Sequence, residues 1–361
     1  MSLISKEEEN NAFISALVLC FSRITPAIIN AAIDLNLFEI IPSKGIMSAS
    51  EIASKLPIEK EDTDMVAKRL ERMLPSLASH SLLECSIRIN QDGTKERVYA
   101  LSNVGAYFRS SHHEHEYGGS LTPLSVLFHR VYDDLWKDAK DSILDPNNNH
   151  FERVYGMPMF EYLKTNKEIS HVFDQTMAQS GPLGMKRIIS LYKGFEGVKT
   201  LVDVGGGIGQ TLNLIISAFP SIKGINFDMP HVVKNAPSYL GIEHVGGDMF
   251  ESVPKGDAIM LKHVCHNWSD EECVKFLRNC HEALPQHGKV IVLDFIMPEI
   301  PNSSNSSKHI CDVDYLMFII NGGKERTQKE FERLCINSGF SRFQVACTTS
   351  LTTFAVIEFY K

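Results

Sequence analysis

The sequence of 361 residues lacks a long uninterrupted apolar run. Its longest one, residues 12–21, contains Ser15 and stops before Ser22 and Arg23, so it is too short to span a bilayer. The basic start and small-residue cleavage site of a signal peptide are also missing. We therefore expect a cytoplasmic protein that does not enter a membrane.

Clusters of basic residues are absent too, and the formal net charge is −8. Because nucleic-acid phosphates are bound by grouped Lys and Arg, this composition argues against a nucleic-acid partner. The eight cysteines form no Cys-x-x-Cys pair and lie scattered in apolar segments, as reduced core cysteines do. The length and the 43% hydrophobic content allow a globular protein of two domains.

Residues 1–110 are predicted to form a mostly helical domain with one β-hairpin, similar to a winged helix. The helix expected over residues 12–34 is apolar on nearly every face, so it lies either deep in a core or against another chain. Ser48 and Glu51 form a capping box, and strands over 82–89 and 97–101 flank Asp92-Gly93. The acidic charge favours dimerisation or substrate enclosure over DNA binding.

Residues 111–190 look helical and are expected to link the two domains and contribute to a substrate pocket. They open with His112, His113 and His115. Such a cluster could bind a metal, but no further ligand has a readable spacing. We expect a solvated loop and no metal site.

From residue 199 the chain alternates strands and helices, with strands predicted over 200–204, 222–227, 258–262 and 289–295. This alternation predicts an α/β fold with a Rossmann-like, doubly wound parallel sheet. Two β-rich runs, 343–349 and 353–360, predict an antiparallel hairpin at the edge of that sheet. We assign residues 191–361 to a catalytic domain.

The first strand of this domain runs into alternating glycines, with Asp203 two positions ahead of Gly205 and four ahead of Gly207. Glycines here let the backbone turn sharply and approach a flat cofactor. The dinucleotide pattern G-x-G-x-x-G fails, because Gln210 or Leu212 occupies the last position. An acid before the glycines suits a cationic, amino-acid-bearing cofactor such as S-adenosylmethionine (SAM). The alternative is a tight strand-to-helix turn without a ligand.

Acids follow the next strands as well. Asp228 is placed to accept hydrogen bonds from ribose hydroxyls, although it could instead cap a helix near His231. Asp248 could accept the adenine amino hydrogens while Met249 packs on the purine, but Gly-Gly-Asp is also a common loop sequence. The neighbouring Phe250 is grouped with these cofactor residues.

A lysine and two histidines, Lys262, His263 and His266, lie between a strand end and a helix. The capping box of that helix fixes His266 in the preceding turn. A single histidine is usually structural, but two acids accompany it, Asp294 at the end of the next strand and Glu325. Thr327 and Glu330 form a capping box, which leaves Glu325 outside the helix that follows. A histidine oriented by a carboxylate is the arrangement of a general base.

The residues together resemble the plant caffeate-type small-molecule O-methyltransferases, and within them the legume chalcone 2′-O-methyltransferases. The resemblance is carried by Asp-Val-Gly-Gly-Gly-x-Gly, Asn-Phe-Asp, Gly-Gly-Asp-Met-Phe, Cys-His-Asn-Trp-Ser-Asp and Gly-Gly-Lys-Glu-Arg-Thr. It covers nearly the whole chain. It implies a homodimer with an N-terminal dimerisation domain and a C-terminal SAM domain.

The resemblance also implies roles for single residues. It places Gly205, Asp228, Asp248, Met249 and Lys262 at the cofactor, and it makes His266 the general base flanked by Asp294 and Glu325. The family usually has Glu where this chain has Asp294. The missing methylene puts in doubt whether this carboxylate reaches the imidazole, in which case Glu325 orients His266 alone.

The expected reaction is metal-independent methyl transfer from SAM to a phenolic oxygen of a small molecule, with a chalcone 2′-hydroxyl as the expected acceptor. Isoflavones, hydroxycinnamates and arylamines are alternative acceptors, and a catalytically silent dimer partner is the alternative of another class. Asn267 beside the base and Leu316 in the 316–319 segment support the chalcone. Candidates for sandwiching the acceptor ring are Phe160, Phe173, Met177 and Met317, with Leu17 of the partner chain closing the pocket.

Overall fold

The computed structural model describes residues 6–110, 119–144, 150–349 and 354–361. The predicted histidine cluster at 112–115 lies outside these ranges. The chain divides into two compact units, one of residues 1–133 with 171–180 and one of residues 134–170 with 181–361. The boundaries predicted at 110 and 190 stay a prediction.

The N-terminal unit consists of helices around a small antiparallel sheet of order β1-β3-β2. Its elements are α1 (Lys6–Cys20), α2 (Ile24–Asp34), α3 (Leu37–Ile40), β1 (Met47–Ser48), α4 (Ala49–Ala53), η1 (Lys60–Asp62), α5 (Thr63–Ser79), β2 (Leu83–Ile89), β3 (Lys95–Leu101), η2 (Gly105–Phe108) and α6 (Thr122–Val131). The predicted hairpin is β2–β3, and the predicted Ser48–Glu51 capping box opens α4.

The predicted helix over 12–34 is wrong in its continuity, since α1 and α2 are separate helices with a break at residues 21–23. Pro26 explains the break, because a proline ring collides with the carbonyl four residues earlier, here that of Ser22. Across the described ranges no single helix is long and apolar enough to cross a membrane; α1 and α2 pass that test only as a pair bent by 49°.

Helix α1 has no buried residue, so the expectation that it lies deep in a core of its own chain is wrong. Its apolar side chains face outward, with Phe13 63%, Val18 56% and Leu19 73% exposed. The other expectation, that a second chain covers this helix, stays a prediction.

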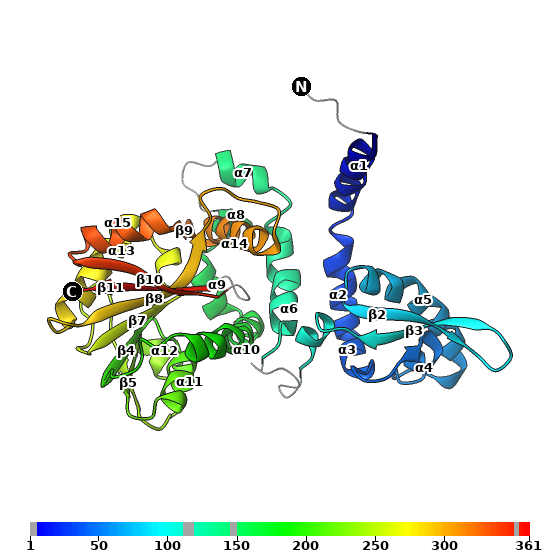
Figure 1. The fold of residues 1–361 in the computed structure, drawn as a ribbon, viewed down its shortest axis with the longest axis horizontal. Coiled ribbons are helices and arrows are strands. Elements are labelled where there is room, and N and C mark those ends of the chain that lie inside the picture. Colours follow the sequence, from blue (N-terminus) through cyan, green and yellow to red (C-terminus); the bar gives the residue numbers. More distant parts are fainter. Residues whose placement is uncertain (1–5, 111–118, 145–149, 350–353) are drawn as a thin grey trace. The chain divides into compact units, whose positions relative to one another are not determined.

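The C-terminal unit is built on a mixed sheet of order β10-β11-β8-β7-β4-β5-β6, with β9 added beside β8 (Figure 1). Its strands are β4 (Thr200–Val204), β5 (Lys223–Asp228), β6 (Ile242–Gly246), β7 (Ala258–Lys262), β8 (Lys289–Met297), β9 (Arg326–Thr327), β10 (Arg342–Thr348) and β11 (Phe354–Tyr360). The five neighbouring strands β6, β5, β4, β7 and β8 are parallel to one another. Strands β10 and β11 form the predicted antiparallel hairpin at the edge of the sheet, where β11 pairs with β8.

Helices cover both faces of this sheet, as a doubly wound fold requires. The helices that follow α6 in the chain are η3 (Tyr132–Asp134), α7 (Ala139–Leu144), α8 (His150–Tyr155), α9 (Met159–Thr165), α10 (Lys167–Leu191), α11 (Gln210–Ala218), α12 (Pro230–Val233), η4 (Cys265–Asn267), α13 (Asp270–Ala283), α14 (Asn305–Asn321) and α15 (Gln328–Asn337). Among them α13 and α15 pack on one face of the sheet, and α10 and α11 pack on the other. Helix α10 runs through both units, since residues 171–180 belong to the first.

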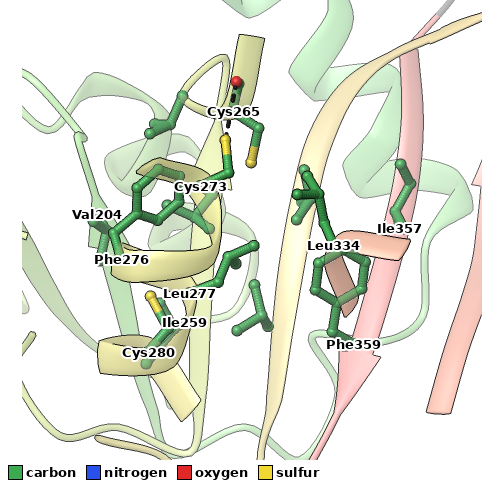
Figure 2. Packing of buried hydrophobic residues seen from close by; sticks show 14 of the residues in the cluster. Val204, Ile259, Cys265, Cys273, Phe276, Leu277, Cys280, Leu334, Ile357 and Phe359 are labelled. Carbon is green, nitrogen blue, oxygen red and sulfur yellow. Dashed lines mark hydrogen bonds between the residues drawn. The ribbon is translucent and has the colours of Figure 1, made fainter. Parts of the chain in front are cut away.

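Successive side chains along each strand point to opposite faces of the sheet, because strand side chains alternate with a period of two. On one face Val204 and Ile259 pack with Phe276 of α13 and Leu334 of α15 (Figure 2). On the other face the remaining strand residues pack against α11 and the C-terminal end of α10. Each fully buried side chain of this size stabilises the fold by about 1.5–3 kcal/mol.

Candidate active site

The carboxyl end of β4 forms a turn that only glycine suits. Gly205, Gly207 and Gly209 all have positive φ angles, of 71°, 59° and 84°. A Cβ on Gly205 would lie 2.8 Å from a Val264 methyl carbon, whereas one on Gly207 would meet nothing within 4 Å. Gly205 is therefore required by packing, and Gly207 borders open space where a ligand can approach the backbone.

Asp203 precedes this turn as a buried acid that lacks a partner. It is 1% exposed, and neither of its carboxylate oxygens has a hydrogen-bond partner within the described part of the chain. Burial raises the pKa of Asp203 to about 7, against the opposing effect of Lys262. Buried polar groups are usually hydrogen-bonded or paired, so this carboxyl is suited to a positively charged or hydrogen-bond-donating partner.

Asp228, at the end of β5, holds the glycine turn in place. Its Oδ2 accepts the Gly207 N–H at 2.8 Å, and its Oδ1 accepts the Met229 N–H at 2.7 Å. The helix-cap alternative is wrong, because α12 begins after Met229 and has no side-chain cap. Each carboxylate oxygen keeps a lone pair that can accept a further hydrogen bond.

Asp248 and its neighbours follow β6. Oδ1 of Asp248 accepts the Phe250 N–H at 2.8 Å. Met249 is partly buried against the core cluster of the sheet, and Phe250 packs edge-on against Trp268 with ring centroids 4.9 Å apart. Asp248 is thus held by its own loop, and Phe250 has a core role in addition to any contact with a cofactor.

Lys262 ends β7 and lies between two acids, Asp203 and Asp294. Burial lowers the pKa of Lys262, and these two carboxylates oppose that effect. The lysine therefore links the glycine turn electrostatically to the histidines that follow.

His266 lies in η4, ahead of α13, whose Ser269–Glu272 capping box is present as predicted. Its Nδ1 is 2.7 Å from Oε1 of Glu325, and the two side chains are 11% and 0% exposed. Burial lowers the pKa of His266. Burial and the nearby Asp294 raise the pKa of Glu325 to about 9. The pair is a dry imidazole–carboxylate dyad, which suits proton transfer.

Asp294 lies beside His266, as the resemblance implies, but it makes no hydrogen bond to the imidazole. Its Oδ1 is 3.8 Å from Nδ1 of His266, beyond hydrogen-bond distance, and 3.2 Å from Nδ1 of His263. The shortfall expected from the missing methylene agrees with this geometry. Asp294 lies inside β8, opposite Ala355 of β11, and not at the end of a strand.

Arg326 joins the two segments that carry the dyad. This fully buried side chain donates from Nη1 to the Cys265 carbonyl at 2.6 Å and from Nη2 to the Trp268 carbonyl at 2.7 Å. The Lys324 N–H donates to the carbonyl of His266 at 2.9 Å. Glu325 is thereby fixed opposite His266, and its own N–H donates to Asp314 at 2.8 Å.

His263, His266 and Asp294 also form a group of the kind that can hold a metal ion, with ligand atoms within 4.8 Å of one another. Sequence analysis did not identify this group. A metal there would compete with Glu325 for Nδ1 of His266. The expectation of a metal-free enzyme stays a prediction.

The predicted acceptor residues divide between the units. Leu17, Phe173 and Met177 belong to the N-terminal unit, and their approach to His266 stays a prediction. In the other unit Phe160 is 53% exposed and Leu316 is buried, with 8% exposed. Met317 in α14 is half-buried.

Asn267 is less free than its position beside the base suggests. Its Nδ2 donates to the His263 carbonyl at 3.0 Å, and its Oδ1 accepts from Asn321 at 2.8 Å. One amide hydrogen and one oxygen lone pair of Asn267 remain free to bind a methyl-acceptor molecule.

Three residues that hold this site together were not predicted from the sequence: Asn226, His263 and Arg326. Asn226 is fully buried and donates to the Gly207 carbonyl at 2.8 Å. A polar residue within an apolar strand was the available signal for Asn226, and an arginine beside the orienting glutamate was the signal for Arg326. The contacts of His263 depend on an unusual backbone angle, which no local pattern indicates.

Two family descriptions match the chain. An O-methyltransferase domain matches residues 136–341, and an O-methyltransferase dimerisation domain matches residues 17–111. Among solved structures, human N-acetylserotonin methyltransferase in complex with SAM shares the fold, with a TM-score of 0.78 and 18% identity over 100% of this chain and 99% of that one.

Curated plant proteins are similar over nearly their full length. The caffeic acid 3-O-methyltransferase of Medicago sativa is 45% identical over 360 residues, which is 98% of this chain and 95% of the relative. That of Prunus dulcis is 46% identical over the same shares of the two chains. The chain therefore belongs to the plant caffeic acid 3-O-methyltransferase-type family and is a SAM-dependent O-methyltransferase.

Proposed function

We propose that the enzyme methylates a phenolic hydroxyl of a small phenylpropanoid, with His266 as the general base. The dyad of His266 and Glu325 is the observation that carries this proposal, because its 2.7 Å contact is buried and lies next to an acid-lined glycine turn. The names of the Medicago and Prunus relatives support a phenylpropanoid acceptor.

The cofactor would be held at the carboxyl ends of β4, β5 and β6, where open α/β sheets bind ligands. Asp203 would pair with its ammonium, Asp228 with its ribose hydroxyls, and Asp248 with its adenine amino group. Gly205 and Gly207 would let it lie against the backbone. When bound, SAM supplies the electrophilic methyl group.

His266 would accept the phenolic proton at Nε2 while Nδ1–H donates to Glu325. A phenol pKa of about 10 and a histidine pKa of about 6.5 differ by roughly 3.5 units, so full proton transfer before attack costs about 5 kcal/mol. The proton therefore moves as the new O–CH₃ bond forms and the S–CH₃ bond breaks. Glu325 stabilises the resulting imidazolium.

A finer proposal concerns the acceptor, for which a chalcone 2′-hydroxyl is the first candidate. Asn267 adjoins His266, and its remaining amide hydrogen and lone pair suit the carbonyl and hydroxyl that a chalcone places side by side. A hydroxycinnamate is the competing candidate, since the relatives are caffeic acid 3-O-methyltransferases.

The acceptor is tested with methyl-labelled SAM and a panel of a 2′-hydroxychalcone, an isoflavone and caffeic acid, with products identified by mass spectrometry. Highest kcat/KM for the chalcone, with the label on the hydroxyl beside the carbonyl, supports the finer proposal. A preference for caffeic acid or the isoflavone rejects it and leaves phenolic methylation standing. Turnover of none of the phenols rejects both.

We further propose a homodimer in which helix α1 is covered by a second copy. The match of residues 17–111 to a dimerisation domain and the 73% exposure of the apolar Leu19 support it. Leu19→Glu should shift the mass measured by light scattering toward the monomer, because a charge cannot be buried unpaired in the interface. Leu240→Glu is the matched control, since Leu240 is 96% exposed in the C-terminal unit. A monomeric parent protein rejects the proposal.

A further inference from the structure

His263 lies between β7 and η4 in a backbone conformation that is uncommon for a residue with a side chain. Its φ angle is 53°, in the left-handed region. Its N–H donates to the Leu293 carbonyl at 3.1 Å, and its own carbonyl accepts from Asn267 at 3.0 Å. These contacts hold the backbone and direct the ring toward Asp294.

His263 and His266 compete for one carboxylate oxygen. Oδ1 of Asp294 is 3.2 Å from Nδ1 of His263 and 3.8 Å from Nδ1 of His266, so only the first pair is within hydrogen-bond distance. Oδ2 of Asp294 is buried and has no partner in the ranges that the structure describes. Among the described residues, His263 is therefore the one that hydrogen-bonds to the Asp294 side chain.

The two imidazole rings also contact each other. They are nearly parallel, with an interplanar angle of 16° and centroids 5.1 Å apart. The His263 ring further contacts Phe295 and Phe354, at centroid distances of 5.2 and 4.6 Å. Packing on these aromatic neighbours fixes the orientation of His263, and His263 in turn borders the base.

We propose that His263 is a positioning residue for the general base. By donating a hydrogen bond to Asp294 it keeps this carboxylate away from Nδ1 of His266, so that Glu325 is the single carboxylate that orients the base. The inference rests on the proposed role of His266. It predicts that His263 sets the pH at which His266 becomes protonated, although it does not touch the reacting atoms.

The charges around both rings are consistent with this role. Burial lowers the pKa of His263, helped by Lys262, His266 and His309, so His263 stays a neutral donor at neutral pH. The pKa of Asp294 is raised by burial to about 6, so this side chain is ionised above that pH.

The other charged groups that act on His266 are Lys262, Arg326 and Glu325. Arg326 is held by backbone carbonyls and Glu325 by the dyad bond, and neither contact involves the His263 ring. Lys262 interacts electrostatically with Asp203 as well as with Asp294. Of the charges around the base, only Asp294 loses its hydrogen bond when His263 is replaced.

Two substitutions distinguish the effect of the His263 ring from the effect of its hydrogen bond to Asp294. His263→Phe keeps an aromatic ring but removes the donor. His263→Asn keeps a donor at the position of Nδ1 and tolerates the left-handed backbone. In the Phe variant Asp294 is free to move from 3.8 Å to about 2.8 Å from His266, which at an effective dielectric constant of about 20 raises the histidine pKa by about one unit.

The acid limb of the kcat/KM profile should therefore move about one pH unit upward in His263→Phe and stay in place in His263→Asn. KM for SAM should change less than about twofold, because the ring is not a cofactor ligand. His263→Phe/Asp294→Asn should lose the upward shift, since Glu325 is then the one carboxylate beside the base and no second one can approach it. His263→Ala is the substitute if the Phe variant does not fold, and circular dichroism checks each protein.

An unchanged limb in His263→Phe, or a shift that persists in the double variant, overturns the inference. His266→Ala is measured in parallel. If this variant keeps the parent rate, the assignment of His266 as the base is wrong. If it is inactive while the His263 variants keep the acid limb of the parent enzyme, only the proposed role of His263 is wrong. A chelator is present in every assay, because His263, His266 and Asp294 can also hold a metal ion.

Discussion

Replacing Glu325 by glutamine is expected to lower the plateau rate of methyl transfer and to move the acid limb of the pH profile toward lower pH. His266 and Glu325 titrate as a pair across their 2.7 Å contact. When the pair takes up a further proton, Nε2 of His266 no longer has a free lone pair. Activity is therefore lost as the pH falls through the pKa of the pair.

The structure bounds both changes. Burial raises the pKa of Glu325 to about 9 and lowers the pKa of His266, so the limb of the parent enzyme, in which the two groups titrate together, should lie above that of His266 alone and below about 9. Without the carboxylate His266 titrates alone, and burial lowers its pKa below 6.5. A hydrogen bond to a charged group contributes about 1.5–3 kcal/mol, so the plateau rate should fall about tenfold to a hundredfold.

The assay is kcat/KM for the best acceptor across the pH range, with SAM saturating. Glu330→Gln is a matched control, because Glu330 belongs to the capping box of α15 and not to the dyad. A limb that does not move down in Glu325→Gln would refute the paired titration.

Further outcomes follow from the same site. His266→Ala should lose about a hundredfold to ten-thousandfold in kcat with nearly unchanged SAM affinity, measured by calorimetry, and retention of more than about a tenth of the rate would contradict the base role. Asp294→Glu should keep at least the parent plateau rate because the longer side chain reaches His266; a loss as large as that of Glu325→Gln would reject the view that Glu325 alone orients the base. Asp203→Asn should weaken SAM binding about tenfold to a hundredfold. Since the pKa of Asp203 is about 7, SAM affinity of the parent enzyme should also fall below that pH, and a pH-independent affinity would argue against the ammonium pairing.

Local signals predicted much of the catalytic unit. The positive φ angles at Gly205 and Gly207 and the capping boxes at Ser269 and Thr327 depend on neighbouring residues only, so they are visible in the sequence. Glu325 was identified because it lies outside the helix that Thr327 caps. The break before α2 was missed because the apolar run hid the effect of Pro26.

Contacts between distant segments were not predictable in the same way. The bond between His263 and Asp294 requires a left-handed backbone at His263 and a register in which Lys262 pairs with Leu293. Arg326 reaches Cys265 across 61 positions of the chain. Such contacts follow from the packing of β7, β8 and β9, which no periodicity in the sequence encodes.

The arginine contact has a consequence for how acceptor preference can change. Arg326 fastens the segment of Glu325 to the segment of His266 through backbone carbonyls, which no substitution at Cys265 or Trp268 removes. The His266–Glu325 pair is thus preorganised by its own scaffold, before any substrate is bound. With His266 in the proposed role of general base, substitutions at the proposed acceptor residues Phe160 of α9 and Met317 of α14 should change acceptor preference and leave the acid limb of the pH profile in place.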